Sequence, residues 1–283
     1  KELRHLGGIC GVHCENAGVI DGMIAEKKAA GLMGPSSHPE TRPPYLEAEA
    51  IGRLLRIAQA ADCPVVIVHL TNEEALKEVE HARKRGQKVY VETCPQYLLL
   101  DESVYYDPDY SQAARYICAP PIREKANQEA LWRGLRRGEI QTVSTDHCSF
   151  TLAQKDAGRE DFTKIPGGLP GVETRGELIY SYGVAAKKLS LAQMCRVLSE
   201  NPAKLYGLYP RKGVLAPGSD ADIVIYDPGD SHVIRAEDCI ANVDYNPYEG
   251  FVTAGGIREV WLRGRKTVEN GKVLDTVPAG MYL

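Results

Sequence analysis

The chain of 283 residues is long enough for one large α/β barrel-type domain or two smaller domains, which excludes a peptide or a small disulfide-stapled module. Hydrophobic residues make up 43% and charged residues 25%, so the composition is globular rather than disordered. The formal net charge is −4, no Lys/Arg cluster is denser than residues 133–137, and no apolar run approaches the roughly 20 residues that span a bilayer. We therefore expect neither nucleic acid nor membrane among the partners.

The cysteine pattern and the start of the chain bear on its cellular context. Eight cysteines are scattered without a CxxC pair, and they are too dilute for a disulfide scaffold. Reduced thiols in the cytoplasm are the expected state. The chain has no apolar signal-peptide segment near its start. It begins at Lys1 rather than Met, so we expect further residues upstream.

In about the first 200 residues, short β-branched runs alternate with amphipathic helical stretches, a pattern typical of βα units around a parallel sheet. The four predicted strands cover residues 9–13, 65–70, 89–93 and 142–146. The predicted helices cover residues 46–60, 73–85, 127–137 and 191–198. Gly86 and Gly138 are expected to end the second and third helices, and Ser190 to cap the fourth. Four successive βα units are half of an eightfold barrel.

The character of the sequence changes around residues 209–218, where Pro210, Gly213, Pro217 and Gly218 punctuate the chain. We therefore predict a first domain over residues 1–210 and a β-rich domain over residues 211–283. Its predicted strands cover residues 221–226, 259–262 and 266–268, and an Asn-Gly hairpin turn at 270–271 leads to Val273.

Three of the first four predicted strands end in a side chain that can bind a metal, namely His13, His69 and Asp146. The carboxyl ends of the strands of a parallel barrel converge on one mouth, so these three could meet at one centre. Imidazole and carboxylate groups suit zinc or a similar divalent ion. Each residue also has a purely structural interpretation, as a hydrogen-bonded histidine at a strand end or an aspartate that caps a helix.

The other histidines and the first cysteines are weaker candidates. Strand alternation places Cys10 and Cys14 on the face opposite His13, which disfavours a Cys/His zinc knuckle. His147 points away from Asp146, either as a partner of a metal ligand or as a packing residue. The remaining histidines lie in polar or helical segments, so we expect their side chains on the surface. They are His5, His38, His81 and His232.

Two loops rich in proline and glycine are candidates for ligand contact. Residues 118–124 contain two successive prolines, which remove two backbone donors and fix an extended loop. Residues 165–171 combine fixed and permissive backbone angles and could approach a substrate closely. Both could equally be rigid connections, and neither is a phosphate-binding motif.

Several segments occur in the order found in the dihydropyrimidinase/hydantoinase branch of the amidohydrolase superfamily, and the resemblance covers nearly the whole chain. The segments that carry it are residues 12–16, 68–70, 92–98, 119–124, 144–148 and 168–173. Residues 201–204, 218–223 and 243–247 resemble the last barrel helix and the β-sandwich of that family. Allantoinases, a sister branch, share the Pro-Pro-Ile-Arg loop.

The resemblance implies a centre of two divalent metal ions, most simply zinc, in a TIM barrel. It implies that His13 and His69 bind one metal and that Asp146 binds the other and shuttles a proton. The implied reaction opens the ring of a dihydropyrimidine or hydantoin to an N-carbamoyl amino acid. Main-chain groups at Ala119 and Gly167 would hold this cyclic ureide, although Ser and Asn are common there in the family.

The sequence also departs from the family. An early His-x-His pair, a carboxylated lysine and a tyrosine beyond it have no counterpart, and the first strand here corresponds to the fifth of the barrel. We therefore expect the C-terminal half of a TIM (β/α)8-type barrel followed by β-sandwich strands. With three of six metal ligands, we expect the isolated chain to bind metal weakly and to lack activity.

Exposed sheet edges should favour assembly, and a homodimer or homotetramer is the family expectation for the full-length form. Three alternatives stay open at this point. They are an allantoinase-like hydrolase, a non-catalytic scaffold protein of the same fold, and an interaction module built around the β-rich tail.

Overall fold

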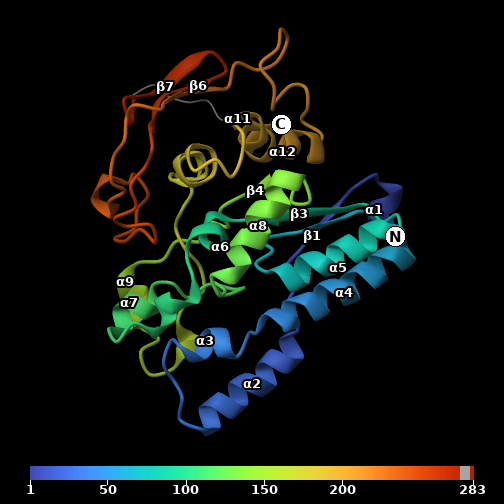
Figure 1. Cartoon of the computed structure of the whole chain (residues 1–283), viewed down its shortest axis with the longest axis vertical. Helices are drawn as coiled ribbons and strands as arrows, with labels where there is room; N and C mark the ends of the chain where they lie inside the picture. The colour runs from blue at the N-terminus through green and yellow to red at the C-terminus, as the bar shows by residue number, and fades with distance from the viewer. Residues whose placement is uncertain (275–280) are drawn as a thin grey trace.

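The computed structural model describes residues 1–274 and 281–283, and its first part is built on four parallel strands in the order β1-β2-β3-β4 (Figure 1). These strands are Cys10–Val12, Val65–Ile67, Val89–Thr93 and Thr142–Val143, so all four predicted strands are confirmed. Cys10 lies opposite Val65, which lies opposite Val89, so the strands run in register. Their carboxyl ends therefore share one edge. Among the described residues the sheet is open rather than closed into a barrel.

Three long helices cover one side of this sheet, and their positions agree with the prediction. They are α4 (Pro44–Ala61), α5 (Glu73–Lys84) and α8 (Ala126–Arg137), and Figure 1 shows α4 and α5 side by side. Gly138 ends α8 with a left-handed backbone, which a residue without Cβ adopts at little cost. The core lies between helices and sheet and includes Ile51, Val79 and Leu131. Burial of these apolar faces is what holds the layers together.

The remaining helices are short, with one exception. They are α1 (Glu2–His5), α2 (Ala17–Ala29), α3 (Ser37–Glu40), α6 (Pro95–Leu99), α7 (Tyr110–Ala114), α9 (Leu152–Asp156), α10 (Arg175–Ile179), α11 (Leu191–Cys195) and α12 (Asn201–Leu205). Further turns of 3-10 or π helix are η1 (Glu102–Tyr106), η2 (Phe162–Lys164), η3 (Tyr180–Ala185), η4 (Arg196–Glu200) and η5 (Ala236–Asp238). Ser190 caps α11 as predicted, in a capping box with Gln193. The 13-residue helix α2 was not predicted, because it buries only Ile20 and so lacks an apolar stripe.

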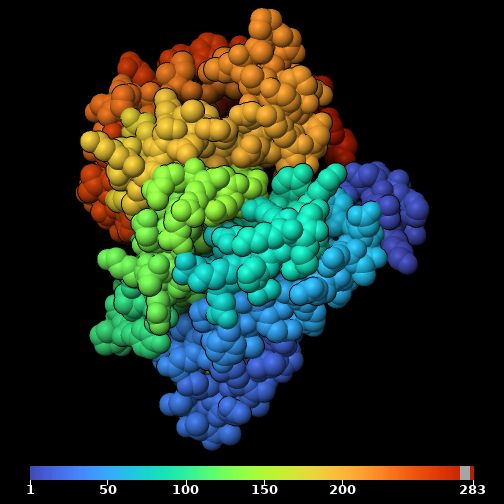
Figure 2. Space-filling view, turned by 45° about the vertical axis from the view of Figure 1, so that its right-hand side comes forward, coloured from blue at the N-terminus to red at the C-terminus, as the bar shows by residue number. Residues whose placement is uncertain are grey.

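The end of the chain forms a second, antiparallel sheet in the order β5-β6-β7-β8. Its strands are Ile223–Asp227, Gly256–Leu262, Arg265–Glu269 and Lys272–Val273, which agrees with the predicted strands and hairpin. Asn270 and Gly271 both have positive φ, as a tight two-residue hairpin turn requires. This part lies at the opposite end of the molecule from α2, and its orange-red surface appears in the upper part of the space-filling view (Figures 1 and 2). Among the described helices, none combines the length and apolar character of a membrane-spanning segment.

One predicted surface residue is buried instead. His5, His81 and His232 are exposed as expected, but His38 is only 7% exposed. It lies in the single turn α3, where the neighbouring Ser37 and Pro39 are buried as well. The prediction was wrong because such a short segment has no periodic pattern that indicates which face is buried. His38 Nε2 donates to the carbonyl of Cys118 at 2.8 Å. Burial lowers the pKa of His38 to about 4, so the ring is neutral at pH 7.

Acid should therefore destabilise the chain through His38. The folded pKa of about 4 lies below the ordinary value of 6.5, so between these values the unfolded chain binds the proton more readily. The stabilisation is complete above about pH 6.5 and is lost as the pH falls towards 4. The loss in the free energy of unfolding should reach about 3 kcal/mol, measured by urea unfolding at a series of pH values.

Two substitutions separate this contribution from the acid sensitivity of the rest of the chain. His38→Gln keeps a donor for the Cys118 carbonyl but does not titrate, and it should flatten the pH dependence between pH 6.5 and about 4. His81→Gln, at an exposed position of α5, should keep the wild-type dependence. Equal pH dependence in all three proteins would contradict this assignment.

Candidate functional site

Two of the three predicted metal ligands face each other. His13 and His69 come directly after the neighbouring strands β1 and β2, and His13 Nδ1 lies 3.0 Å from His69 Nε2. The rings meet edge to face, with centroids 4.8 Å apart. His69 is 6% exposed, and its Nδ1 is buried without a hydrogen-bond partner in the described part of the chain. The structure thus brings the two imidazoles together at the carboxyl edge of the sheet.

A buried carboxylate orients the His13 ring. His13 Nε2 donates to Glu15 Oε2 at 3.0 Å, and Arg42 Nη1 donates to the same oxygen at 2.8 Å. Burial alone would raise the pKa of Glu15, but the hydrogen bond from His13 and the charge of Arg42 outweigh it, so the pKa is lowered. Glu15 therefore stays ionised, keeps the proton of His13 on Nε2 and leaves Nδ1 directed at His69. This role of Glu15 was not predicted, although the His-x-Glu spacing of residues 13–15 could have indicated it.

Asp146 is not part of this pair. It follows β4 and is exposed, and among the described residues no three His, Cys, Asp or Glu side chains converge as a metal-binding group. The sheet order explains the separation, because β3 lies between β2 and β4 and neighbouring strands are about 4.8 Å apart. Asp146 still acts on His69 through its charge. Burial and the neighbouring His13 lower the pKa of His69, and the Asp146 carboxylate opposes them.

Both His69 and Asp146 have left-handed backbones, with φ of +41° and +48°. Residues with a Cβ rarely adopt this conformation, which is strained and tends to occur at functional positions. Between them, on β3, lies Glu92, whose pKa is raised by burial. The strand that separates the predicted ligands therefore places a further carboxyl group between them.

The two predicted substrate-contact residues lie side by side. A Cβ added to Gly167 would lie 4.0 Å from the backbone nitrogen of Ala119, and Gly167 is exposed while Ala119 is half-buried. No hydrogen bond of the described residues uses the N–H or C=O of either one. The adjacent carbonyls are occupied, since His38 donates to Cys118 and Tyr97 donates to Pro120. Each of the two loops therefore carries one free peptide group next to carbonyls that are hydrogen-bonded.

A buried lysine joins the two loops that carry these peptide groups. Lys155 Nζ donates to the carbonyls of Ile117 and Pro166 at 2.7 Å and to that of Gly168 at 2.8 Å. Lys155 was not predicted as a site residue, because it belongs to the five-residue helix α9 and no local pattern distinguishes it. His147 contributes at the far end of the second loop, where its Nδ1 accepts from the N–H of Gly171 at 3.1 Å.

A buried ion pair joins the elements that carry the candidate residues. Glu47, on α4, accepts a hydrogen bond from Arg123 Nη2 at 2.9 Å, and the two residues are 2% and 5% exposed. Glu47 also accepts from the N–H of Thr71, two residues after His69, at 2.9 Å. Arg123 belongs to the Pro-Pro loop and donates to the carbonyl of Arg42. This ion pair thus connects three parts of the site. They are the turn after His69, the loop of Ala119, and Arg42, which donates to Glu15.

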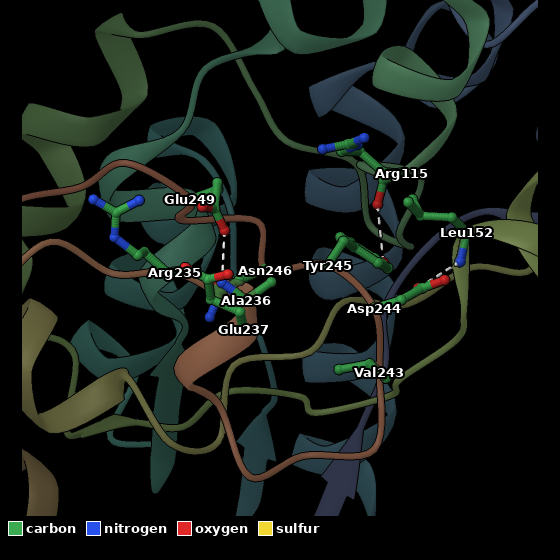
Figure 3. A pocket seen from close by; sticks show the side chains of 10 residues that line it. All are labelled: Arg115, Leu152, Arg235, Ala236, Glu237, Val243, Asp244, Tyr245, Asn246 and Glu249. Carbon is green, nitrogen blue, oxygen red and sulfur yellow. Dashed lines mark hydrogen bonds between the residues drawn. The ribbon is translucent and has the colours of Figure 1, made fainter. Parts of the chain in front are cut away.

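Two other features do not belong to this site. Cys14 is a buried core residue whose pKa burial raises to about 12, and Cys10 packs against the same core. A hollow of about 510 Å³ lies elsewhere on the surface, and Figure 3 shows its lining. There Tyr245 donates to the carbonyl of Arg115 and Asp244 accepts from the N–H of Leu152. This hollow contains none of the predicted site residues.

Comparison with known proteins places the chain in a family. The amidohydrolase family model matches residues 18–268. The chain is 44% identical over 277 residues to the D-hydantoinase of Streptomyces coelicolor, which covers 98% of this chain and 59% of the relative. It is 41% identical over 281 residues to the D-hydantoinase of Geobacillus stearothermophilus, covering 99% of this chain and 59% of that relative.

Solved structures give the same result. The dihydropyrimidinase of Brevibacillus agri NCHU1002 matches with a TM-score of 0.94 at 43% identity, over 95% of this chain and 59% of that chain. The L-hydantoinase of Arthrobacter aurescens matches with a TM-score of 0.90 at 32% identity, over 96% and 60%. The chain therefore spans about 59% of the length of the relatives named first. Because the family model extends over most of the sequence and the fold follows that of solved relatives, this chain belongs to the amidohydrolase family.

Proposed function

We propose that this chain supplies part of the catalytic site of a metal-dependent hydrolase that opens dihydropyrimidine or hydantoin rings to N-carbamoyl amino acids. The observation that carries the proposal is the pair of facing imidazoles, His13 and His69, after adjacent strands of an α/β sheet. The names of the relatives, D-hydantoinase and dihydropyrimidinase, support the substrate class.

The two histidines fit a divalent ion. Two nitrogen ligands of one tetrahedral zinc ion lie about 3.3 Å apart, since Zn–N bonds are about 2.0–2.1 Å long. The facing nitrogens here are 3.0 Å apart, and the lowered pKa of His69 keeps that ring neutral, as a metal ligand must be. A divalent ion bound here would polarise a carbonyl group and lower the pKa of a water molecule.

Asp146 is proposed as a ligand of a second ion and as the proton carrier. Water adds its oxygen to the ring carbonyl and the ring C–N bond breaks. Asp146 accepts a proton from the water and delivers it to the ring nitrogen that is released. The exposed position of Asp146 at the carboxyl edge of the sheet suits a group that exchanges protons with substrate. Zinc is the expected metal at both positions.

The free peptide groups of Ala119 and Gly167 are proposed to hold the substrate. A cyclic ureide contains a cis amide, which presents an N–H and a C=O side by side. Peptide N–H and C=O groups are complementary to that pattern, and neither residue uses its own elsewhere in the described part of the chain. Recognition through the backbone also accommodates Ala119 and Gly167 in place of the Ser and Asn common in the family.

The proposal extends to the architecture. We infer that the four parallel strands, within residues 1–210, correspond to the C-terminal half of a (β/α)8 barrel and that β5–β8, within residues 211–283, are β-sandwich strands. Residues 275–280 of the second region lie outside the described residues. The TM-score of 0.94 to a dihydropyrimidinase supports this correspondence, as do the exposed Val224 and Ile225 on edge strand β5. Free sheet edges favour homo-oligomers, and eight free cysteines suit a cytoplasmic protein.

The other interpretations are less favoured. A non-catalytic scaffold protein has no need of the His13–His69–Glu15 arrangement. An allantoinase-like hydrolase or an interaction module built on the β-rich tail has no support among the relatives named above, which are hydantoinases and a dihydropyrimidinase.

The histidine pair should bind zinc weakly in the isolated chain, because the sequence contains only three of the six expected ligands. Isothermal titration with Zn²⁺ near neutral pH measures the affinity. His69→Asn should weaken zinc binding at least about tenfold, since it removes one of the two histidines proposed to bind the ion. His81→Asn, at an exposed position of α5, is the matched control and should bind like the wild type. If H69N and the wild type bound zinc equally, the ion would have to lie elsewhere.

A chimera tests the reaction. It joins the part of the Streptomyces coelicolor D-hydantoinase that this chain does not cover to the whole of this chain, so that all expected ligands are present. With Zn²⁺ or Mn²⁺ it should open dihydrouracil or hydantoin, whereas the isolated chain should not. Asp146→Asn in the chimera should reduce turnover by at least about 100-fold with little change in melting temperature. A folded chimera without ring opening, or an active D146N variant, would rule out the proposed role.

A further inference from the structure

Lys155 occupies an unusual environment for a lysine. Its side chain is 0% exposed, and among the described residues it has no carboxylate partner. The ammonium group is instead surrounded by three backbone carbonyls and by the ring of Phe150, whose centroid is 5.6 Å away. Burying an ammonium group without a counter-ion is unfavourable, and apolar residues fill such space at less cost. The arrangement therefore suggests a role other than stability.

The three carbonyls belong to the two loops of the candidate substrate site. Ile117 lies two residues before Ala119, and Pro166 and Gly168 lie on either side of Gly167. The N–H of Gly168 also donates to the carbonyl of Ile117 at 3.0 Å. One ammonium group thus holds both neighbours of Gly167 against the loop that carries Ala119.

The far end of the second loop is fixed by other contacts. Cys148 donates its N–H to the carbonyl of Leu169, and the N–H of Gly171 donates to His147. Lys155 holds the near end through the carbonyls of Pro166 and Gly168, which flank the free peptide group of Gly167. Its removal should therefore loosen one end of the loop and leave the rest of the fold in place.

We infer that Lys155 is a positioning residue for cyclic-amide binding, because it sets the separation of the free peptide groups at Ala119 and Gly167. This inference rests on the proposed function of those two groups. Two peptide groups that bind one cis amide must keep their spacing to a fraction of an ångström, and a small displacement weakens both hydrogen bonds together.

Lys155→Met tests the inference, because methionine fills similar space without donors or charge. Lys164→Met, at an exposed position in η2, is the matched control. Hydrogen–deuterium exchange should become at least about tenfold faster at residues 117–123 and 165–171 in K155M, and stay unchanged in α5. Titration with dihydrouracil should give an affinity at least about tenfold weaker, while zinc affinity at His13 and His69 is retained.

Each result decides a separate point. Wild-type dihydrouracil affinity in K155M, unchanged loop exchange, or equal losses of protection in the loops and in α5 would overturn the inference. A wild-type chain and a chimera that both fail to bind dihydrouracil would instead contradict the proposed function, and the exchange data would still decide whether Lys155 holds the loops. Parallel loss of zinc and ureide affinity in K155M would mean a merely structural residue.

A second measurement needs no substitution. Burial lowers the pKa of Lys155 to about 8, so alkaline pH replaces the ammonium group by an amine with one N–H fewer. The other titratable side chains facing it are Cys118, Cys148 and His38. From about pH 7 to about pH 9.5, exchange protection in the two loops should fall relative to α5 after correction for intrinsic rates. Protection that stays constant in both loops would overturn the inference.

Discussion

The ion pair between Glu47 and Arg123 is the interaction on which the candidate site depends. Glu47 lies on a helix and Arg123 on a loop, and neither is near the other in sequence. Through Thr71 the pair reaches the turn of His69, and through the carbonyl of Arg42 it reaches the residue that supports Glu15. Because both charges are buried, either one without the other would be strongly unfavourable. The ion pair therefore disfavours other arrangements of the helix and loop that carry the two residues. The imidazole pair and the substrate loop share this frame.

Several buried polar side chains of the site each form hydrogen bonds that fix a particular ring or loop. Glu15 holds the ring of His13, His38 holds the carbonyl of Cys118, and Lys155 holds the ends of two loops. Such groups contribute little net stability, because removing them from water offsets much of what their hydrogen bonds provide. They do reduce the number of conformations that the loops can adopt. The site is thus fixed by direction-specific hydrogen bonds, whereas the layers beneath it are held by apolar burial.

Much of the fold could be predicted from local sequence. Strands 65–67 and 89–93 are β-branched runs of the right length, and the hairpin at Asn270 follows from turn chemistry that acts over two residues. The positions of His13, His69 and Asp146 at strand ends could be predicted for the same reason. The separation of Asp146 from the histidine pair follows from the order of strands in the sheet, because β3 lies between β2 and β4.

Most of the contacts that were not predicted join residues far apart in the sequence. Lys155 meets a carbonyl 38 positions away and His38 one 80 positions away, and no periodic pattern encodes either pairing. Glu15 is an exception, since it lies two residues from His13 and could have been read as its partner. Helix α2 went unpredicted because it buries one side chain and therefore lacks the apolar stripe that prediction requires.

The left-handed backbones at His69 and Asp146 have a consequence for how this sequence can vary over time. Gly, Asn, Asp and to a lesser degree His adopt positive φ more readily than other residues, and β-branched residues there are strongly strained. Substitution at these two positions is therefore biased towards a few residue types, even in a descendant that has lost its activity. Invariance of His69 or Asp146 among relatives would have two causes, the backbone geometry and selection for catalysis. The contribution of backbone geometry would have to be known before such invariance could be taken as a sign of activity.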